Sequence, residues 1–161
     1  MHRRDLLKAA PLLMAPALAR AENRPLKYIP NAALSAIDPI WTTALVAAIH
    51  GYLVFDTLYG IDDAAQLHPQ MCAGHELSDD KLTWTFTLRD GLLFHDGAKV
   101  LAKDCVQSLR RWGSRDSFGQ VLLATTNELT ALDDRRFRFR LKKPFSQMLY
   151  GLGARNCFMM P

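Results

Sequence analysis

Two histidines and a cysteine lie close together in the sequence, and side chains of these types can bind a metal ion. His68, Cys72 and His75 follow the spacing H-x3-C-x2-H. Structural zinc sites usually take four Cys or His ligands, and no further cluster of such residues lies nearby. We therefore expect no metal site and no cofactor. Zinc or nickel binding that is lost when His68 and His75 are replaced by Ala is the testable alternative.

A histidine and an aspartate are adjacent at His95-Asp96, which could be read as an acid–base pair. Adjacent side chains rarely aim at one point, and Asp96 precedes Gly97, so we expect Asp96 to cap its own backbone in a turn. The sequence also lacks the G-x-S-x-G elbow, the P-loop and a G-x-G-x-x-G segment after a strand. We predict that the chain is not an enzyme.

Aromatic side chains could line a binding pocket by stacking or by apolar contact. Trp84 alternates within a strand pattern and Trp112 lies on the apolar face of a helix pattern, so both are assigned to packing. Trp41, next to a loop, and Phe118, in the polar stretch RDSFGQ, are the better candidates for a site.

A half-buried strand is predicted over LTWTFTLRDG (82–91). Threonines alternate there with Leu82, Trp84, Phe86 and Leu88, and aspartates and a glycine bound the segment. The apolar residues should therefore face the core of a sheet.

A hairpin is predicted over ELTALDDRRFRFRL (128–141), with Asp133-Asp134 between two extended runs. Its second run alternates arginines with Phe137, Phe139 and Leu141. We interpret the arginines as a solvent-exposed face in preference to a ligand-binding stripe.

Two helices are predicted from apolar spacing. One runs from Trp41 to Leu58 and should pack with its Leu/Ile face inward, with Gly51 as its weak point. The other begins at Ala102 and should end at Gly113, after arginines in its last turn. Before them, Leu26–Pro30 (LKYIP) is predicted to be a short strand.

The charge is concentrated at the N-terminus of the 161-residue chain. Residues 1–21 carry four basic and one acidic side chain, whereas residues 22–161 carry 16 basic and 15 acidic ones, so nothing indicates a nucleic-acid partner.

The first 21 residues have a basic start, an apolar stretch and small residues at Ala17, Ala19 and Ala21, which is typical of a cleaved export signal. Arg3-Arg4 resembles a twin-arginine signal, and a general-secretion signal is the alternative. A bacterial periplasmic location follows.

Three cysteines, Cys72, Cys105 and Cys157, form no C-x-x-C pair. An odd number cannot be fully paired within one chain, so at least one should be a free thiol. Cys105 lies within the apolar pattern of the second helix, where a buried cysteine behaves as a small hydrophobic residue. We expect no disulfide framework.

The stretch LHPQMCAGHELSDDKLTWTFTLRDGLLFHDGAKVLAKDCVQSLRRW (67–112) resembles the signature region of family 5 extracellular solute-binding proteins, which serve ABC importers of peptides, nickel and related solutes. The resemblance extends from ALSAIDP (33–39) through VFDTLYG (54–60) to RFRFRLKKPF (136–145), and so covers nearly the whole mature chain.

The resemblance implies a mixed α/β (α+β) fold. Residues 22–161 would form part of the first lobe of a two-lobed periplasmic-binding-protein type II fold, which is incomplete in this chain. By position, the ligand-facing segments of the family fall on Trp41 and Thr42 and on Phe118, and less directly on Arg155 and Asn156. The family's second lobe, with the acidic residue that commonly pairs with a peptide's amino group, has no counterpart here. The helix that usually begins with a threonine cap and an acidic residue has Leu101 and Lys103 instead, and should lack a side-chain cap.

The function that the resemblance implies is a periplasmic substrate-binding component of an ABC transporter for peptide uptake. Its partners would be a small solute or short peptide and a permease in the inner membrane. The alternative is a truncated, non-transporting secreted domain or fragment with a structural or adaptor role. A reading frame that continues past Pro161 would favour the first, and a natural stop with stable expression of the short form would favour the second.

Overall fold

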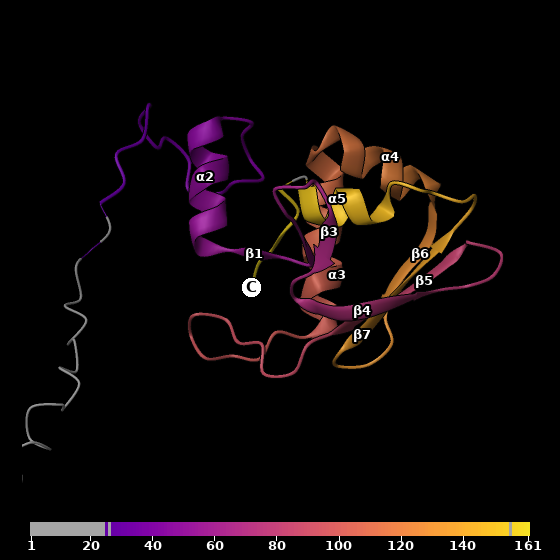
Figure 1. Ribbon diagram of the computed structural model, residues 1–161. Helices are drawn as coiled ribbons and strands as arrows, with labels where there is room; N and C mark the ends of the chain where they lie inside the picture. The colour runs from indigo at the N-terminus through magenta and orange to yellow at the C-terminus, as the bar shows by residue number, and fades with distance from the viewer. Residues whose placement is uncertain (1–24, 26, 155) are drawn as a thin grey trace, which may run out of the picture.

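The computed structural model describes residue 25, residues 27–154 and residues 156–161, so the predicted export signal lies outside the described residues. Figure 1 shows a mixed fold in which α3 runs beside a sheet, α4 and α5 lie next to each other, and α2 is set apart from the sheet. The elements in chain order are α2 (Leu45–Val54), β1 (Asp56–Thr57), β2 (Tyr59–Ile61), β3 (Leu67–Pro69), β4 (Cys72–Leu77), β5 (Thr83–Leu88), α3 (Ala102–Arg115), α4 (Ser117–Thr125), β6 (Thr126–Ala131), β7 (Arg136–Leu141), α5 (Met148–Ala154) and β8 (Phe158–Met159).

The central sheet is antiparallel, with the strand order β4-β5-β7-β6. The alternation predicted for β5 is confirmed, because Trp84, Phe86 and Leu88 are buried and the threonines between them are half-buried. Phe86 pairs across the strands with Phe137 on β7, which is fully buried too. Helix α3 packs against β6 and β7, so the aromatic face of the sheet and the apolar face of α3 form the core.

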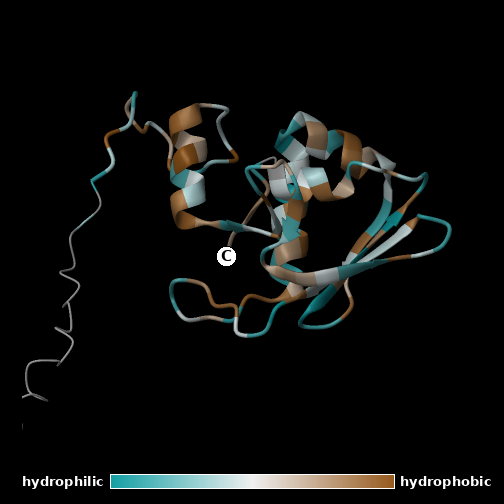
Figure 2. Cartoon of the chain, viewed as in Figure 1, coloured by the Kyte–Doolittle hydropathy of each residue, from teal (hydrophilic) through white to brown (hydrophobic). Residues whose placement is uncertain are grey.

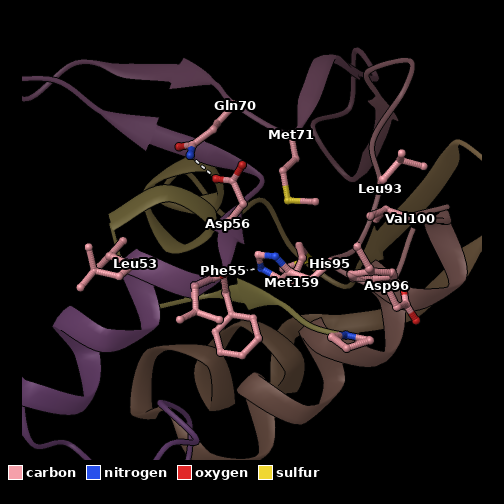
Figure 3. Close-up of a pocket in the computed structure, with 14 residues that line it drawn as sticks. Leu53, Phe55, Asp56, Gln70, Met71, Leu93, His95, Asp96, Val100 and Met159 are labelled. Atoms are coloured by element: carbon pink, nitrogen blue, oxygen red, sulfur yellow. Dashed lines mark hydrogen bonds between the residues drawn. The ribbon is translucent and has the colours of Figure 1, made fainter. Parts of the chain in front are cut away.

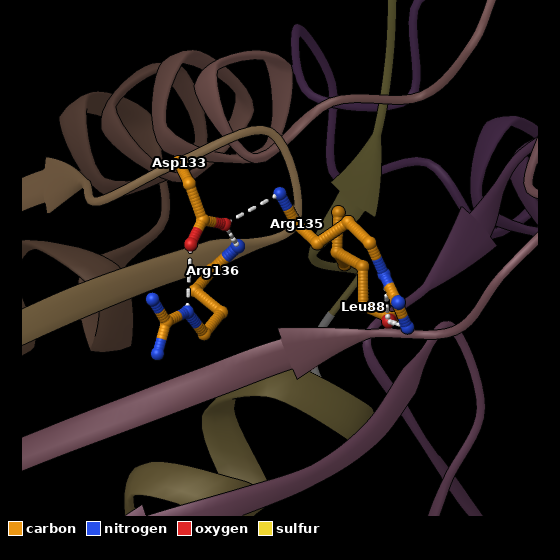
Figure 4. Close-up of polar contacts among 4 residues, drawn as sticks. All are labelled: Leu88, Asp133, Arg135 and Arg136. Carbon is orange, nitrogen blue, oxygen red and sulfur yellow. Dashed lines mark hydrogen bonds and ion pairs between the residues drawn. The ribbon is translucent and has the colours of Figure 1, made fainter.

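The predicted hairpin of β6 and β7 is also confirmed, with its turn at Asp133 (Figure 4). The Asp133 carboxylate accepts hydrogen bonds from the backbone N–H groups of Arg135 and Arg136, at 2.9 and 2.7 Å, and from Arg136 Nε at 2.7 Å. The backbone bond from Arg135, followed by the Arg136 side chain, lowers the pKa of Asp133. Arg135 also donates to the Leu88 carbonyl oxygen, at 2.7 Å from Nη2, and so ties the turn to the end of β5.

Helix α3 is longer than predicted, since it continues through Gly113 to Arg115. A Cβ at Gly113 would lie 2.4 Å from Leu123 Cδ1, and a Cβ at Gly119 would lie 2.8 Å from Gly113 Cα. The glycine thus permits close approach of α3 to α4, and the prediction that it ends the helix was wrong. Asp116 separates the two helices and caps α4 by accepting hydrogen bonds from two of its backbone N–H groups.

The start of α3 lacks a side-chain cap from Leu101, as predicted. Asp104 compensates in part, because its Oδ2 accepts a hydrogen bond from the Leu101 N–H at 2.9 Å. This is the acidic half of a capping box, and it also places a negative charge in the first turn of the helix.

The strand predicted at Leu26–Pro30 is wrong over the part that the structure describes, because residues 27–30 have no regular secondary structure. No described strand pairs with this segment, and the Ile29 side chain is 89% exposed. A short apolar run does not form a strand without a neighbour to accept and donate its backbone hydrogen bonds.

Helix α2 is shorter than the predicted helix and buries a different face. Its Leu45 and Leu53 side chains are each 64% exposed, whereas Val46, Ala47 and Gly51 are buried, so the inward Leu/Ile face was a wrong prediction. Figure 2 shows that hydrophobic residues occur on most turns of α2, which is why their spacing alone did not identify the buried side. The small residues of α2 determine which side of the helix is buried, because they allow close packing.

Gly51 allows that packing, and a larger side chain there should be costly. A Cβ at position 51 would lie 2.6 Å from Phe158 Cε2 and 2.9 Å from Pro39 Cβ. We expect Gly51→Leu to lower the free energy of unfolding by about 1–3 kcal/mol, measured by urea denaturation. The control Leu53→Gln, on the exposed side of the same helix, should change it by less than about 0.5 kcal/mol. Equal effects of the two substitutions would contradict this packing.

The C-terminal segment is joined to β1 and to α3. Strand β1 pairs with β8, so that Thr57 lies opposite Phe158. The Ser108 hydroxyl on α3 donates to the Met160 carbonyl oxygen at 3.1 Å and accepts from the Met160 N–H at 3.0 Å. Helix α3 therefore fixes the C-terminal segment against the segment that follows α2.

The three cysteines are buried and none is in a disulfide, so the expectation of no disulfide framework is confirmed. Burial raises the pKa of Cys72 and of Cys105 to about 12 and that of Cys157 well above its ordinary value. No helix among the described residues has the length and hydrophobicity needed to cross a membrane.

Candidate functional site

A small cleft of about 230 Å³ lies where the loop before α2 meets the junction of α3 and α4. It is lined both by apolar residues and by residues that carry hydroxyl, amide or charged groups. The residues that line this small cleft are Pro39, Ile40, Thr42, Thr43, Trp112, Arg115, Asp116 and Asn156. Thr42, one of the predicted ligand-facing residues, is thus part of a cavity wall.

Trp41 lies beside the small cleft and is held by Arg115. The Arg115 guanidinium carbon lies 3.8 Å from the centre of the Trp41 ring, a close cation–π contact. Trp41 is 67% exposed, so it is not part of the core. The packing assignments of Trp84 and Trp112 are confirmed, since these side chains are 7% and 2% exposed.

A second arginine, one helical turn earlier on α3, holds the same loop. Arg111 forms an ion pair with Asp38, and its Nη1 lies 3.2 Å from Met160 Sδ. Arg111 and Arg115 are four residues apart, so they lie on one face of α3. This face therefore positions the loop that carries Trp41 and Thr42.

The hydroxyl of Thr42 is oriented by the backbone before α2. Its Oγ1 accepts a hydrogen bond from the Ala44 N–H at 3.2 Å, which leaves the hydroxyl proton available for donation. Ala44 is the N-cap of α2 and provides no side-chain cap, and the first turn of the helix contains no acidic residue. The positive end of the α2 dipole is therefore close to the small cleft.

Phe118, the third predicted ligand-facing residue, does not line the small cleft. Its ring packs against Trp112, Phe145 and Tyr150, with centroid distances of 6.4, 5.6 and 6.1 Å. A Cβ at Gly151 would lie 2.4 Å from Phe118 Cε1, so the ring is tightly seated between α4 and α5. In this structure Phe118 supports Trp112 from behind the cleft wall.

Asn156 also lines the small cleft. Its φ of 36° is in the left-handed region, which asparagine tolerates better than most residues. Arg155, the other weaker candidate, lies outside the described residues.

A large cavity of about 640 Å³ lies between the end of α2, the 93–96 loop and the C-terminal segment (Figure 3). Its residues are mostly apolar: Tyr52, Leu53, Val54, Phe55, Asp56, Gln70, Met71, Leu93, Phe94, His95, Asp96, Val100, Met159 and Pro161. Two of its charged or titratable side chains already have partners. Asp56 accepts from Gln70, and His95 Nε2 lies 2.9 Å from the Val54 carbonyl oxygen. None of the predicted ligand-facing residues lines it.

The His95-Asp96 pair forms a turn, as predicted. Asp96 Oδ1 accepts a hydrogen bond from the Ala98 N–H at 2.9 Å, and Gly97 has a φ of 84°. Because the two side chains have separate backbone partners, they do not act on a common point.

The three residues of the H-x3-C-x2-H spacing are not brought together. His68 Nε2 lies 2.7 Å from Asp62 Oδ2, and His75 Nδ1 lies 2.7 Å from the Tyr59 hydroxyl. In the part of the chain that the structure describes, no three His, Cys, Asp or Glu residues are placed to hold a metal ion.

Comparison with known families gives a match over residues 66–160 to the bacterial extracellular solute-binding proteins, family 5, middle region. The match covers the sheet, α3, α4 and the C-terminal segment. The chain belongs to this family. The resemblance of residues 67–112 to the family's signature region is thereby confirmed, and the family consists of extracellular solute-binding proteins.

This family 5 chain is similar to named relatives over much of its length. It is 41% identical over 168 residues to the probable peptide ABC transporter periplasmic-binding protein y4tO of Sinorhizobium fredii, an alignment that covers 99% of this chain and 32% of y4tO. It is 26% identical over 117 residues to the glutathione-binding protein GsiB of Salmonella typhi, covering 71% of this chain and 23% of that protein. The chain therefore spans about a third, or less, of the length of these relatives.

Solved structures show the same fold. The peptide-bound OppA of Listeria monocytogenes superposes with a TM-score of 0.72 at 20% identity, covering 82% of this chain and 30% of OppA. The Escherichia coli murein tripeptide-binding protein MppA gives a TM-score of 0.65 at 23% identity, covering 78% of this chain and 28% of MppA. The predicted fold class, part of a type II periplasmic-binding-protein fold with mixed helices and strands, is confirmed.

Arg115 is a residue of the small cleft that was not predicted from the sequence. The prediction ended α3 at Gly113, which placed Arg115 in a loop with no defined direction. A signal was present, because Arg111 and Arg115 have the i, i+4 spacing of neighbours on a helix. The spacing places Arg111 and Arg115 on one face only if the helix continues through Gly113.

Proposed function

We propose that this chain is part of the periplasmic substrate-binding component of an ABC importer that takes up short peptides. The observation that carries the proposal is the 41% identity, along 99% of the chain, to a protein named as a probable peptide-transporter binding protein. Because the chain spans only part of such relatives, its solute and its partners belong to the proposal.

The small cleft supports a role in solute contact. It combines apolar residues, Pro39 and Ile40, with hydroxyl and guanidinium donors that can fix a polar ligand. In binding sites of small molecules a few such polar groups set the orientation of the ligand. We assign ligand contact to Trp41 and Thr42, and we propose that Phe118 contributes by holding Trp112 in place.

The proposal assigns no catalysis to the chain. Its partners are a short peptide or related small solute and a permease of the inner membrane, and its location is the periplasm. The support for this location is the family, whose members are extracellular, together with the export signal predicted at residues 1–21.

Deleting the gene tests the proposal. We expect the deletion strain to lose uptake of a ¹⁵N-labelled pool of Ala-Xaa-Ala tripeptides, whereas uptake of labelled free amino acids stays unchanged. Re-expression of the wild-type gene should restore the tripeptide uptake. Undiminished uptake in the deletion strain, together with no binding of the pool by the purified protein, would rule the proposal out.

A further inference from the structure

The Arg115 guanidinium is the group in the small cleft best placed to bind an anion. It projects from the last turn of α3, where its charge complements the helix dipole, and its Cζ lies 3.8 Å from the centre of the Trp41 ring. This cation–π contact uses the charge of the guanidinium but none of its five N–H donors. Trp41 therefore holds the guanidinium in place without occupying its donors.

The carboxylates near Arg115 are engaged elsewhere. Asp38 pairs with Arg111, and Asp116 Oδ1 accepts from the Phe118 and Gly119 N–H groups at the start of α4. No ion pair seen among the described residues involves Arg115. Its positive charge is thus available to a ligand.

Two threonines of the small cleft favour the same kind of ligand. Thr42 can donate its hydroxyl proton, because its oxygen already accepts from the Ala44 N–H. Thr43 lies on the same wall, immediately before the N-cap of α2, where the helix dipole is positive. The large cavity offers no such arrangement, since Asp56 and His95 already have protein partners.

We propose that the small cleft recognises a carboxylate of the solute through Arg115, assisted by the Thr42 hydroxyl. This inference rests on the proposed function and specifies its solute as a peptide that carries a carboxylate at this position. Two sources of a carboxylate fit, the free C-terminus and an acidic side chain. A planar guanidinium matches a carboxylate with two parallel hydrogen bonds, which an amide cannot reproduce.

Native mass spectrometry of the exported protein, in the length in which its own cell makes it, tests the proposal. The probes are a pool of Ala-Xaa-Ala tripeptides with free C-termini, the same pool with amidated C-termini, and amidated Ala-Glu-Ala. We expect the wild-type protein to bind the free-acid pool at least about tenfold more tightly than the amidated pool. If the side chain is the source, amidated Ala-Glu-Ala should bind as tightly as the free acids.

Arg115→Met keeps the length and apolar contact of the side chain but removes its charge. We expect it to reduce the preference for carboxylate peptides to less than about twofold. Arg140→Met, which makes the same change on the exposed side of β7, should keep the wild-type preference. Arg115→Lys keeps a cation on the Trp41 ring but not the paired donors, so it should show an intermediate preference for carboxylate peptides. This variant tests the proposal if Arg115→Met does not fold.

The outcomes separate the two proposals. Equal binding of the acid and amide pools by the wild-type protein, together with no tighter binding of amidated Ala-Glu-Ala than of the amide pool, would overturn the carboxylate inference and leave peptide binding intact. An unchanged preference in both Arg115 variants would overturn it as well. Binding of none of the three probes would overturn the proposed function and, with it, this inference.

Discussion

Replacing Phe86 by Ala is expected to lower the free energy of unfolding by about 3–5 kcal/mol. Phe86 is fully buried at the centre of the sheet, where its ring stacks with Phe137 at a centroid distance of 5.2 Å and an interplanar angle of 16°. It also contacts Trp84, at 6.1 Å, and Phe139, at 6.2 Å. Loss of the ring would remove buried apolar surface and leave a cavity between strands that cannot easily collapse.

Urea denaturation followed by tryptophan fluorescence measures this effect. The control is Thr85→Ala, one residue away on the other face of β5, where the side chain is only half-buried. We expect that substitution to cost less than about 1 kcal/mol. If Phe86→Ala lowers the free energy of unfolding by less than Thr85→Ala does, the aromatic face of the sheet is not the core.

The second large effect is a loss of stability in alkali. The pKa of Cys72 and of Cys105 is raised to about 12, chiefly by burial, and that of Cys157 is raised for the same reason. In the unfolded chain a thiol ionises near pH 8.5. Above that pH the unfolded state therefore holds fewer protons than the folded state, and the free energy of unfolding must fall as the pH rises.

Each of the thiols should contribute a slope of about 1.4 kcal/mol per pH unit between the pKa of the unfolded chain and that of the folded chain. The stabilisation is fully present below about pH 8.5 and is lost progressively toward pH 12. Urea midpoints measured between pH 7.5 and 10 in a reducing buffer would show the decline. A double variant, Cys72→Ala with Cys105→Ala, should show a shallower decline, and a flat profile in the wild-type protein would contradict the burial of the thiols.

Strands β5 and β7 could be predicted from the sequence because both carry a two-residue alternation of buried and more exposed residues. In β7, Phe137 and Phe139 alternate with arginines, and the turn residue Asp133 lies between two extended runs, so local pattern and tertiary environment agree. Strand β4 was not predicted, because its residues show no such alternation. Burial of Trp84 and Trp112 followed from the same reasoning.

The N-terminal part could not be predicted as well, because its pattern is ambiguous. Helix α2 is hydrophobic on most of its turns, and its buried side is decided by where Gly51 can meet Phe158, a contact between residues 107 positions apart. Such a contact leaves no periodic signal. The short run at residues 27–30 has strand-like composition but no partner strand.

The candidate site was predicted in part. Thr42 lines the small cleft and Trp41 lies beside it, whereas Phe118 packs behind the wall and Arg115 was missed. The resemblance to the family pointed to loops by their position along the chain, but the side chains that meet in a cleft depend on where α3 ends. The sequence does not show that Gly113 packs against α4 within α3, because that is a tertiary contact.

Equilibrium dialysis of the purified exported protein against the ¹⁵N-labelled Ala-Xaa-Ala tripeptide pool tests peptide binding, with mass spectrometry used to identify and count the peptides that are retained. We expect one tripeptide to be retained for each protein molecule and to be displaced by excess unlabelled pool. Retention of no peptide by a folded protein would contradict it.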